Sequence, residues 1–289
     1  MTGAEEGSRI FNHELKLRVV SGVILAALVL WVTWTGGLTF ALLWAVAAFA
    51  IYHEYARICS ESVPQGPKLA GYAAVFLVIA SHITGQHGLT YFLISVAVVL
   101  LSGWEFYLRR SVWAGLGLAY AAMPLVAMSE LRSDDAGGLL LILIIFACVW
   151  GADILAYFFG KGFGGPKLAP RISPKKTWSG FIGSLLGALL LTFLVIRFYD
   201  FDFTFVFAAM VLVLAILSQI GDLLESMLKR TFDVKDSGTL IPGHGGVLDR
   251  VDGLVFAAVT LWAVLKVMQL QHNSHISLSA LFESAFLTL

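Results

Sequence analysis

The chain has 289 residues, of which 58% are hydrophobic and only 13% are charged. Soluble globular domains carry about 25% charged residues, so this composition excludes an ordinary soluble enzyme or binding module. The 19 basic and 19 acidic residues cancel to a formal net charge of zero, which gives no reason to expect nucleic acid as a partner. Two cysteines, Cys59 and Cys148, are too few for a disulfide framework or a zinc site of their own.

Apolar runs long enough to cross a bilayer, which takes about 20 residues, recur along the whole chain. They predict an all-α, polytopic integral membrane protein with about nine transmembrane helices and a cytoplasmic N-terminus. The first run follows Lys16 and Arg18 but lacks a small-residue cleavage site, so we expect a retained span and not a signal peptide. The expected spans are 19–35, 38–53, 69–84, 89–107, 112–129, 138–159, 179–199, 203–221 and 253–270.

These spans divide the chain into three parts. Residues 1–18 are expected to form a cytoplasmic tail, residues 19–270 a single membrane-embedded domain, and residues 271–289 a C-terminal tail. Two polar loops, at about 160–178 and 222–252, interrupt the apolar runs of the domain. No internal repeat or low-complexity segment in the sequence indicates a further division.

Lysines and arginines are distributed unequally between the two sides that nine spans create. With the N-terminus inside, 16 of the 19 fall on the cytoplasmic side, and only Arg132, Arg197 and Lys266 fall on the other. Because cytoplasmic loops are enriched in Lys and Arg, this asymmetry supports both the number of spans and their orientation. Both polar loops would then face the cytoplasm, where nucleotides are available.

The first polar stretch, residues 151–180, places an aspartate in an apolar run before a basic, glycine-rich loop. Asp153 is costly in a membrane span unless it meets a cation or a metal. Glycine allows backbone N–H groups to approach an anion closely while Lys or Arg supplies charge, so the loop is suited to phosphates. A basic loop is equally typical of an anchor beside anionic lipid headgroups, and the residues alone leave both interpretations open.

The second polar stretch, residues 221–253, holds six carboxylates and four basic residues between long apolar runs. If the eighth helix continues to residue 230, Asp222 and Glu225 share one of its faces, because they are three residues apart. Asp249 and Asp252 have the same spacing where the ninth helix begins. Carboxylate pairs on separate helices can converge on a divalent ion, and Mg²⁺ usually takes one or two carboxylates with phosphates and water.

Ion pairing at a membrane surface is the competing interpretation of these charges. We expect it to explain Glu225 with Lys229, and also Asp233, better than a direct role in chemistry would. The same interpretation is weaker for Asp222 and Asp249, because both adjoin apolar helices, where an ionisable group is a functional candidate by default.

Two ordered motifs occupy these polar stretches. Residues 226–252 read S-M-L-K-R-T-F-D-V-K-D-S-G-T-L-I-P-G-H-G-G-V-L-D-R-V-D. Upstream lie W-G-A-D at 150–153, A-Y-F-F-G-K at 156–161 and K-L-A-P-R-I-S-P-K-K-T-W at 167–178. Together they closely resemble the phosphatidate cytidylyltransferase, or CDP-diacylglycerol synthase, family. Many relatives carry an acidic or amide residue at the position of Ser179, so we assign Ser179 no catalytic role.

The resemblance implies an all-helical, commonly dimeric membrane enzyme whose site is open to cytosol and bilayer. Such an enzyme transfers CMP from CTP to phosphatidate, yields CDP-diacylglycerol and pyrophosphate, and requires Mg²⁺. By the same resemblance Asp222 and Asp249 hold the metal centre, where K⁺ can accompany Mg²⁺. The expected partners are CTP, phosphatidate, the bilayer and a second copy of the chain, in a bacterial inner membrane with the active site facing the cytoplasm.

Residues are assigned to the site from both lines of argument. The expected catalytic residues are Asp222, Asp249, Asp252 and Lys235, and the expected metal ligands are Asp222, Asp249 and Asp153. The expected substrate-binding residues are Lys161, Lys167, Lys175, Lys176, Lys229, Arg230, His244 and Arg250. His244 has no second His or Cys nearby in the sequence, so it does not indicate zinc. It is equally suited to a phosphate contact and to a structural hydrogen bond.

Two other functions remain alternatives at this point. A CTP-dependent polyprenol or lipid kinase would also use CTP at a membrane, and its product would distinguish it. A cation transporter, which is a different class of protein, would use Asp153 and Asp222 within the membrane and would work without CTP. A CDP-alcohol phosphotransferase is disfavoured, because its spaced D-G…A-R…G…D…D motif is missing from the sequence.

Overall fold

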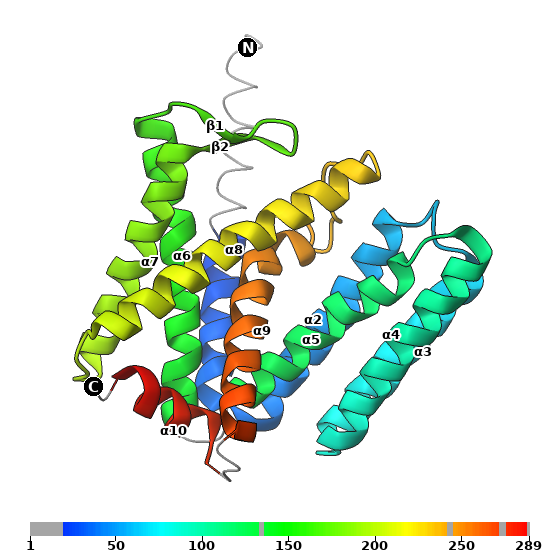
Figure 1. Ribbon diagram of the computed structural model, residues 1–289, viewed down its shortest axis with the longest axis horizontal. Helices are drawn as coiled ribbons and strands as arrows, with labels where there is room; N and C mark the ends of the chain where they lie inside the picture. Colours follow the sequence, from blue (N-terminus) through cyan, green and yellow to red (C-terminus); the bar gives the residue numbers. More distant parts are fainter. Residues whose placement is uncertain (1–19, 133–135, 242–244, 272–275, 288–289) are drawn as a thin grey trace, which may run out of the picture.

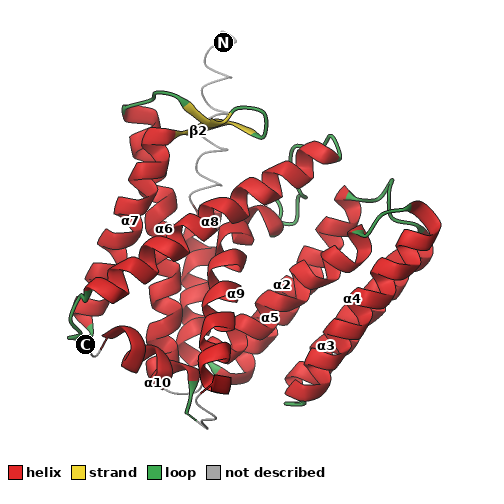
Figure 2. Ribbon diagram, viewed as in Figure 1, coloured by secondary structure: helices red, strands yellow, loops and turns green. Residues whose placement is uncertain are grey.

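A computed structural model describes residues 20–132, 136–241, 245–271 and 276–287. Helices dominate these residues (Figures 1 and 2). The first helix spans Val20–Thr35. It is followed by α2 (Gly37–Ile58), α3 (Gln65–Ile83), α4 (His87–Arg109), α5 (Trp113–Leu131), α6 (Ala136–Gly162), α7 (Trp178–Phe198), α8 (Phe205–Thr231), α9 (Leu248–Gln271), α10 (Leu278–Phe282) and the π-helical turn η1 (Glu283–Leu287).

Each apolar run that was expected to be a span coincides with a helix. Eight of these helices, α2 to α9, are long and apolar enough to cross a membrane. The described part of the first helix, Val20–Thr35, is shorter. The chain is therefore an all-α polytopic integral membrane protein, as expected, while the number of crossings and the side of the N-terminus stay predictions.

Two helices extend beyond the expected spans, and both extensions carry candidate site residues. Helix α8 continues past residue 221 to Thr231, and α9 already begins at Leu248. Charges favour both extensions, because Lys229 and Arg230 lie in the last turn of α8 and Asp249 lies in the first turn of α9. Cations at the C-terminus of a helix and anions at its N-terminus interact favourably with the helix dipole.

The helices pack in two groups that meet at α9. Helices α2 to α5 contact one another, with the α3–α4 pair lying outermost, and α6 to α9 form the second group. Helix α9 contacts α5 and α2 as well as α8, so it joins the groups. A hairpin of two short strands, β1 (Lys167–Ala169) and β2 (Ser173–Thr177), connects α6 to α7. In Figure 1 this hairpin lies toward the upper end, and α10 lies toward the lower end.

The most extensive helix pair, α6 with α7, is packed through glycine. A Cβ atom on Gly187 would overlap the backbone carbonyl oxygen of Gly151, and one on Gly183 would lie 2.7 Å from the carbonyl oxygen of Leu155. Small residues allow the backbones of membrane helices to approach closely. This contact fixes the ends of α6 and α7, between which the hairpin lies.

A polar network joins α5 and α9 at the lower end of the molecule. Glu130 of α5 lies 2.8 Å from the ammonium group of Lys266 and accepts a hydrogen bond of 3.0 Å from the Trp262 ring nitrogen, both in α9. The Tyr91 hydroxyl of α4 also donates to Glu130. A pocket of about 380 Å³ adjoins this network and is lined by side chains that include His82.

Candidate active site

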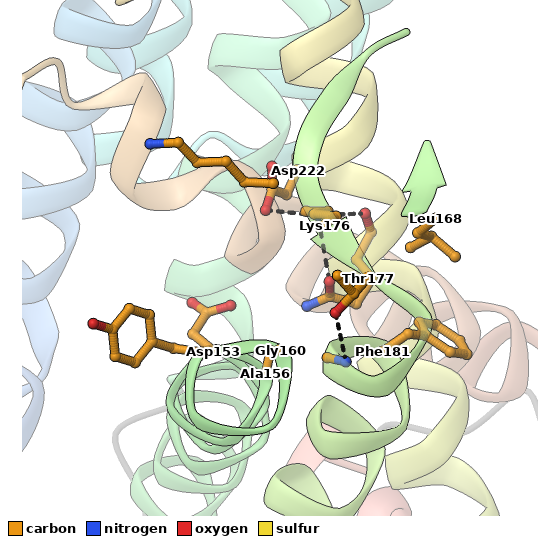
Figure 3. Close-up of a pocket in the computed structure, with 12 residues that line it drawn as sticks. Asp153, Ala156, Gly160, Leu168, Lys176, Thr177, Phe181 and Asp222 are labelled. Atoms are coloured by element: carbon orange, nitrogen blue, oxygen red, sulfur yellow. Dashed lines mark hydrogen bonds and ion pairs between the residues drawn. The ribbon is translucent and has the colours of Figure 1, made fainter. Parts of the chain in front are cut away.

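A pocket of about 210 Å³ opens where the ends of α6 and α7 meet the hairpin and α8. Its polar lining comprises Asp153 and Tyr157 of α6, Lys175, Lys176 and Thr177 of β2, and Gln219 and Asp222 of α8. Figure 3 shows the carboxylate of Asp153 directed from α6 toward the side on which Asp222 and Lys176 lie. The pocket therefore gathers side chains from both polar stretches of the sequence.

The hairpin that carries Lys176 was expected to be a loop. It consists of β1 (Lys167–Ala169) and β2 (Ser173–Thr177), which pair antiparallel. Thr177 then caps α7, because its hydroxyl accepts a hydrogen bond of 3.1 Å from the backbone N–H of Gly180. Ser179 donates to the carbonyl oxygen of Gly164. These contacts tie both ends of the hairpin to α7 and so fix the direction of β2.

Lys176 links β2 to α8. Its Nζ lies 2.7 Å from Asp222 Oδ2 and 3.3 Å from the side-chain oxygen of Gln219. The side chains of Lys176 and Asp222 are only 18% and 34% exposed. Charges attract more strongly when water is partly excluded, so this pair holds the hairpin against α8 and places a cation in the pocket.

Asp252 of α9 adds a third carboxylate to this region. Asp153, Asp222 and Asp252 each lie close enough to interact electrostatically with the other two. Lys176 interacts with Asp153 and Asp252 as well, and Arg250 interacts with Asp153. Three helices and the hairpin thus contribute charges to one cluster.

Two glycines allow α8 and α9 to cross beside these carboxylates. A Cβ atom on Gly221 would lie 2.7 Å from the backbone carbonyl oxygen of Asp252, and a Cβ atom on Gly253 would overlap the hydroxyl of Ser218. Each glycine is the chain neighbour of one carboxylate, Gly221 of Asp222 and Gly253 of Asp252. The close crossing therefore brings the two carboxylates together.

The oxygen-rich cluster is suited to a hard cation. Within the described ranges no three His, Cys, Asp or Glu side chains form a ready-made metal site. Mg²⁺ does not need such a site, because it usually binds one or two protein carboxylates and completes its shell with phosphates and water. Asp153 and Asp222, which line the same pocket, meet that requirement.

Asp249 belongs to a separate network at the first turn of α9. Its Oδ1 lies 2.7 Å from Lys229 Nζ, and its Oδ2 accepts hydrogen bonds of 2.8 Å from the Ser237 hydroxyl and 3.1 Å from Gly246 N–H. Lys229 also lies 2.7 Å from Glu225, which is the ion pair expected from the sequence. Both oxygens of Asp249 already hold donors, so metal binding there would require a donor to leave. The metal role of Asp249 stays a prediction.

The other expected site residues are mostly exposed cations. Six of them are exposed, namely Lys161, Lys167, Lys175, Arg230, Lys235 and Arg250. Lys175 lines the pocket, and so does Tyr157, whose ring lies 5.6 Å from the Lys161 ammonium group. His244 lies outside the described residues.

Two buried side chains near the site were not singled out from the sequence. Glu54 of α2 is fully buried and accepts hydrogen bonds from the N–H groups of Val247 and Leu248. Glu54 could have been found by the argument used for Asp153, because it too is a carboxylate at the end of an apolar run. The buried hydroxyl of Tyr120 has no hydrogen-bond partner among the described residues, although four carboxylates lie near enough to interact with it. Tyr120 could not have been found in this way, because an uncharged tyrosine is common in an apolar run.

Comparison with known proteins identifies the family. A family model described as the cytidylyltransferase family matches residues 16–268. The chain belongs to the cytidylyltransferase family. The matched range contains α2 to α8, the hairpin and most of α9, and therefore both carboxylate networks. The family found in the comparison confirms the resemblance seen in the two motifs.

Named relatives of this cytidylyltransferase come from several bacteria. A Brucella abortus protein named phosphatidate cytidylyltransferase is 39% identical over 251 residues, which cover 86% of this chain and 92% of the relative. A Rickettsia bellii protein of the same name is 39% identical over 180 residues, covering 60% and 78%. One from Haemophilus influenzae is 51% identical over 130 residues, covering 43% and 45%.

Proposed function

We propose that this chain is a phosphatidate cytidylyltransferase, which transfers CMP from CTP to phosphatidate and releases pyrophosphate. The observation that carries the proposal is the 39% identity to a protein of that name over 86% of this chain. The pocket supports it, because carboxylates and lysines meet at the end of membrane helices, where a nucleotide and a lipid headgroup can both approach. Membership of a cytidylyltransferase family favours this function over a CTP-dependent kinase and over a cation transporter.

The chemistry depends on positioning and charge neutralisation more than on a strong base. The phosphate of phosphatidate is already anionic near neutral pH, so one of its oxygens attacks the α-phosphorus of CTP directly. A bond forms between that oxygen and the α-phosphorus, and the bond from the α-phosphorus to the oxygen bridging to the β-phosphorus breaks. Pyrophosphate leaves with the electron pair. Lys175 and Lys176, which line the pocket, would orient the phosphates together with the other exposed Lys and Arg side chains assigned to substrate binding. These cations would also stabilise the negative charge that develops on the phosphates.

We further propose that the reaction requires Mg²⁺. Asp222 and Asp153 would hold the ion, with Asp252 beside them, and the bound ion would neutralise charge on the phosphates and on the leaving group. The unpaired hydroxyl of Tyr120 supports a hydrated site, because it is placed to bond with water among the carboxylates. Binding of Mg²⁺ by Asp249, and of K⁺ beside Mg²⁺, are further predictions.

The proposed setting is the inner membrane of a bacterium, with the site on the cytoplasmic side. Bacterial relatives support the membrane assignment. The basic residues around the pocket support the orientation, because cytoplasmic segments are rich in Lys and Arg. A homodimer, and a single catalytic domain over residues 19–270 between two tails, stay predictions.

The activity can be tested directly. Protein purified in detergent is incubated with phosphatidate, Mg²⁺ and CTP labelled in the cytosine ring, and the lipid is then extracted. We expect the label to enter the organic phase and a chelator of divalent cations to prevent this. Label that stays in the aqueous phase, with folded protein, would contradict the proposal. Transfer of the γ-phosphate of CTP to lipid would instead establish a kinase.

The metal assignment predicts different outcomes for three matched substitutions. Asp222→Asn should raise the Mg²⁺ concentration needed for half-maximal rate by about tenfold or more, since it removes a proposed ligand. Asp249→Asn should abolish turnover while the folded protein stays extractable. Asp233→Asn is the control, because Asp233 is exposed and has a positive φ of 52°, which Asn adopts readily. Normal turnover and Mg²⁺ response in either of the first two variants would show that assignment to be wrong.

A further inference from the structure

Helix α2 contributes one carboxylate to the region of Asp249, and that carboxylate is fully buried. Glu54 has an exposed fraction of 0%. A buried carboxylate is costly unless hydrogen bonds or charges compensate it, and an ionisable group in a membrane span is a functional candidate. Its partners therefore indicate what Glu54 does.

Ser237, Val247 and Leu248, which donate hydrogen bonds to Glu54, lie almost 200 residues later in the chain. Glu54 Oε1 accepts a hydrogen bond of 3.0 Å from Val247 N–H, and Oε2 accepts one of 2.8 Å from Leu248 N–H. The Ser237 hydroxyl lies 3.2 Å from Oε2. The first N–H groups of a helix have no partner within it, and an anion there is favourable. Glu54 thus caps α9 from another helix.

The same segment holds Asp249. The Ser237 hydroxyl lies between the two carboxylates, 3.2 Å from Glu54 and 2.8 Å from Asp249. Successive backbone N–H groups are also divided between them, since Gly246 donates to Asp249 and Val247 donates to Glu54. The position of Asp249 is therefore coupled to that of Glu54 through a shared donor and a shared turn.

Two glycines show how tightly the loop encloses Glu54. A Cβ atom on Gly238 would lie 2.6 Å from Glu54 Oε1, and one on Gly246 would lie 2.5 Å from Oε2. Contacts this short do not occur for real Cβ atoms, so a side chain at either position would displace the carboxylate or the loop. Ser237, Gly238, Gly246 and Val247 therefore all contact the Glu54 carboxylate closely.

We propose that Glu54 is a positioning residue for cytidylyl transfer: it fixes Ser237, residues 245–247 and the start of α9, and so the placement of Asp249 and Asp252. The inference rests on the proposed function. Glu54 does not itself contact the reacting atoms. It acts by presenting a charged acceptor to the N–H groups of Val247 and Leu248 at the start of α9.

The test compares Glu54→Gln with Glu54→Asp and with a matched control, Glu105→Gln. Glutamine keeps the size of the side chain but has one acceptor oxygen, and it points an NH₂ group at N–H donors. Glu105 is also fully buried, and it accepts hydrogen bonds of 2.5 Å from Ser111 Oγ and from the N–H of Ala114 at the start of α5. Both substitutions therefore replace a buried carboxylate that caps a helix. Only Glu54 contacts the loop before α9, whereas Glu105 contacts the start of α5.

Two readouts separate positioning from simple loss of stability. Glu54→Gln should lower kcat per folded molecule by about tenfold or more, as is typical when a residue that orients site residues is replaced, and should accelerate amide exchange at Val247 and Leu248. Glu54→Asp, which keeps the charge, should recover part of both. Glu105→Gln should lower thermal stability but leave kcat, the KM for CTP and the exchange of these two amides unchanged in the folded fraction.

Other outcomes would overturn the inference. If Glu54→Gln leaves amide exchange at Val247 and Leu248 unchanged, Glu54 does not hold the loop. If exchange rises but kcat and KM per folded molecule equal those of the wild type, the cap is purely structural. Failure of the proposed function is distinguishable, because a wild-type protein that makes no CDP-diacylglycerol would reject cytidylyl transfer, while the exchange comparison would still decide whether Glu54 fixes the loop.

Discussion

Lys176 lies where the hairpin meets three helices. It extends from β2, its Nζ is 2.7 Å from Asp222 of α8, and it interacts electrostatically with Asp153 of α6 and Asp252 of α9. Three carboxylates that approach one another repel, so a cation among them offsets part of that repulsion. The same ammonium group is a donor for phosphate oxygens when a nucleotide arrives.

Lys176→Met should therefore impair catalysis more than stability. Removing a preorganised donor to developing charge typically lowers kcat by about 100-fold or more, and we expect an effect of that size. Arg171→Met is the control, because Arg171 is exposed in the turn of the same hairpin and its loss removes the same charge without touching the pocket. A steady-state assay with varied CTP measures both. Equal activities of the two variants would contradict a role of Lys176 in the pocket.

At the scale of single residues the sequence predicted the charges of the site and the Glu225–Lys229 pair, but not most of the other partners. Asp153 and Asp222 were expected in the site because ionisable groups beside apolar spans are functional candidates, and Lys176 was expected because it lies in a basic, glycine-rich loop. All three line one pocket.

Asp249 was expected to hold a metal with Asp222, which stays a prediction; in the structure it binds Lys229 and Ser237. The i, i+3 spacing shows which carboxylates share a face, whereas the rotation of each helix, which decides where the face points, is set by tertiary packing.

Among the helices, the contact between α6 and α7 depends on the absence of side chains. Gly187→Ala should destabilise the protein by about 1–3 kcal/mol, the usual cost of overpacking, because its Cβ would overlap the backbone oxygen of Gly151. Gly103→Ala in α4 is the control, since its Cβ would meet nothing within 4 Å. Thermal unfolding in detergent compares the two. An unchanged midpoint for Gly187→Ala would show that the helices can separate at little cost.

The network between α5 and α9 predicts a stability effect that is independent of catalysis. Lys266→Met removes the ammonium group that lies 2.8 Å from Glu130, and the two side chains are 29% and 10% exposed. The cost should therefore exceed the value for a surface pair and approach that of losing one partner of a fully buried pair, about 3–5 kcal/mol. Arg197→Met is the matched control. Its pair with Asp202 is 49% and 91% exposed, and such surface pairs contribute about 0–1 kcal/mol.

Thermal unfolding should separate Lys266→Met from Arg197→Met, while the KM for CTP should stay unchanged in both, because the network lies at the opposite end from the pocket. A raised KM for Lys266→Met would show that the two ends are coupled.

Elements were predictable to the extent that they are long and apolar. The nine expected runs are helices because about 20 apolar residues leave little choice of structure in a bilayer. The hairpin was not predicted, since strands of three and five residues are too short to show an alternating pattern. Its formation depends on tertiary contacts instead, namely the cap on α7 by Thr177 and the Lys176–Asp222 pair.

For the molecule as a whole, sidedness is the main expectation that rests on sequence alone. The distribution of Lys and Arg predicts that the pocket end faces the cytoplasm. The two native cysteines make this easy to test, because both are buried. Burial also raises the pKa of the Cys59 thiol to about 12, so almost none of it is the reactive thiolate at neutral pH. The wild-type protein should therefore be nearly silent toward maleimides.

A cysteine added to the wild-type protein at either of two exposed positions should then be labelled from opposite sides of the membrane. Glu61→Cys lies in the turn between α2 and α3, at the pocket end, and Asp202→Cys lies between α7 and α8, where the native side chain is 91% exposed. A membrane-impermeant maleimide should label Asp202→Cys in spheroplasts and Glu61→Cys only in inverted vesicles. Both should react after detergent is added, which shows that each thiol is accessible.

The opposite pattern would reverse the orientation and place the carboxylate pocket away from cytoplasmic CTP, which is incompatible with the proposed function. Labelling of both variants from one side would mean that an odd number of crossings does not separate the α2–α3 turn from the α7–α8 turn. The first case challenges the function, whereas the second challenges only the count of spans, since the pocket geometry is the same for either count.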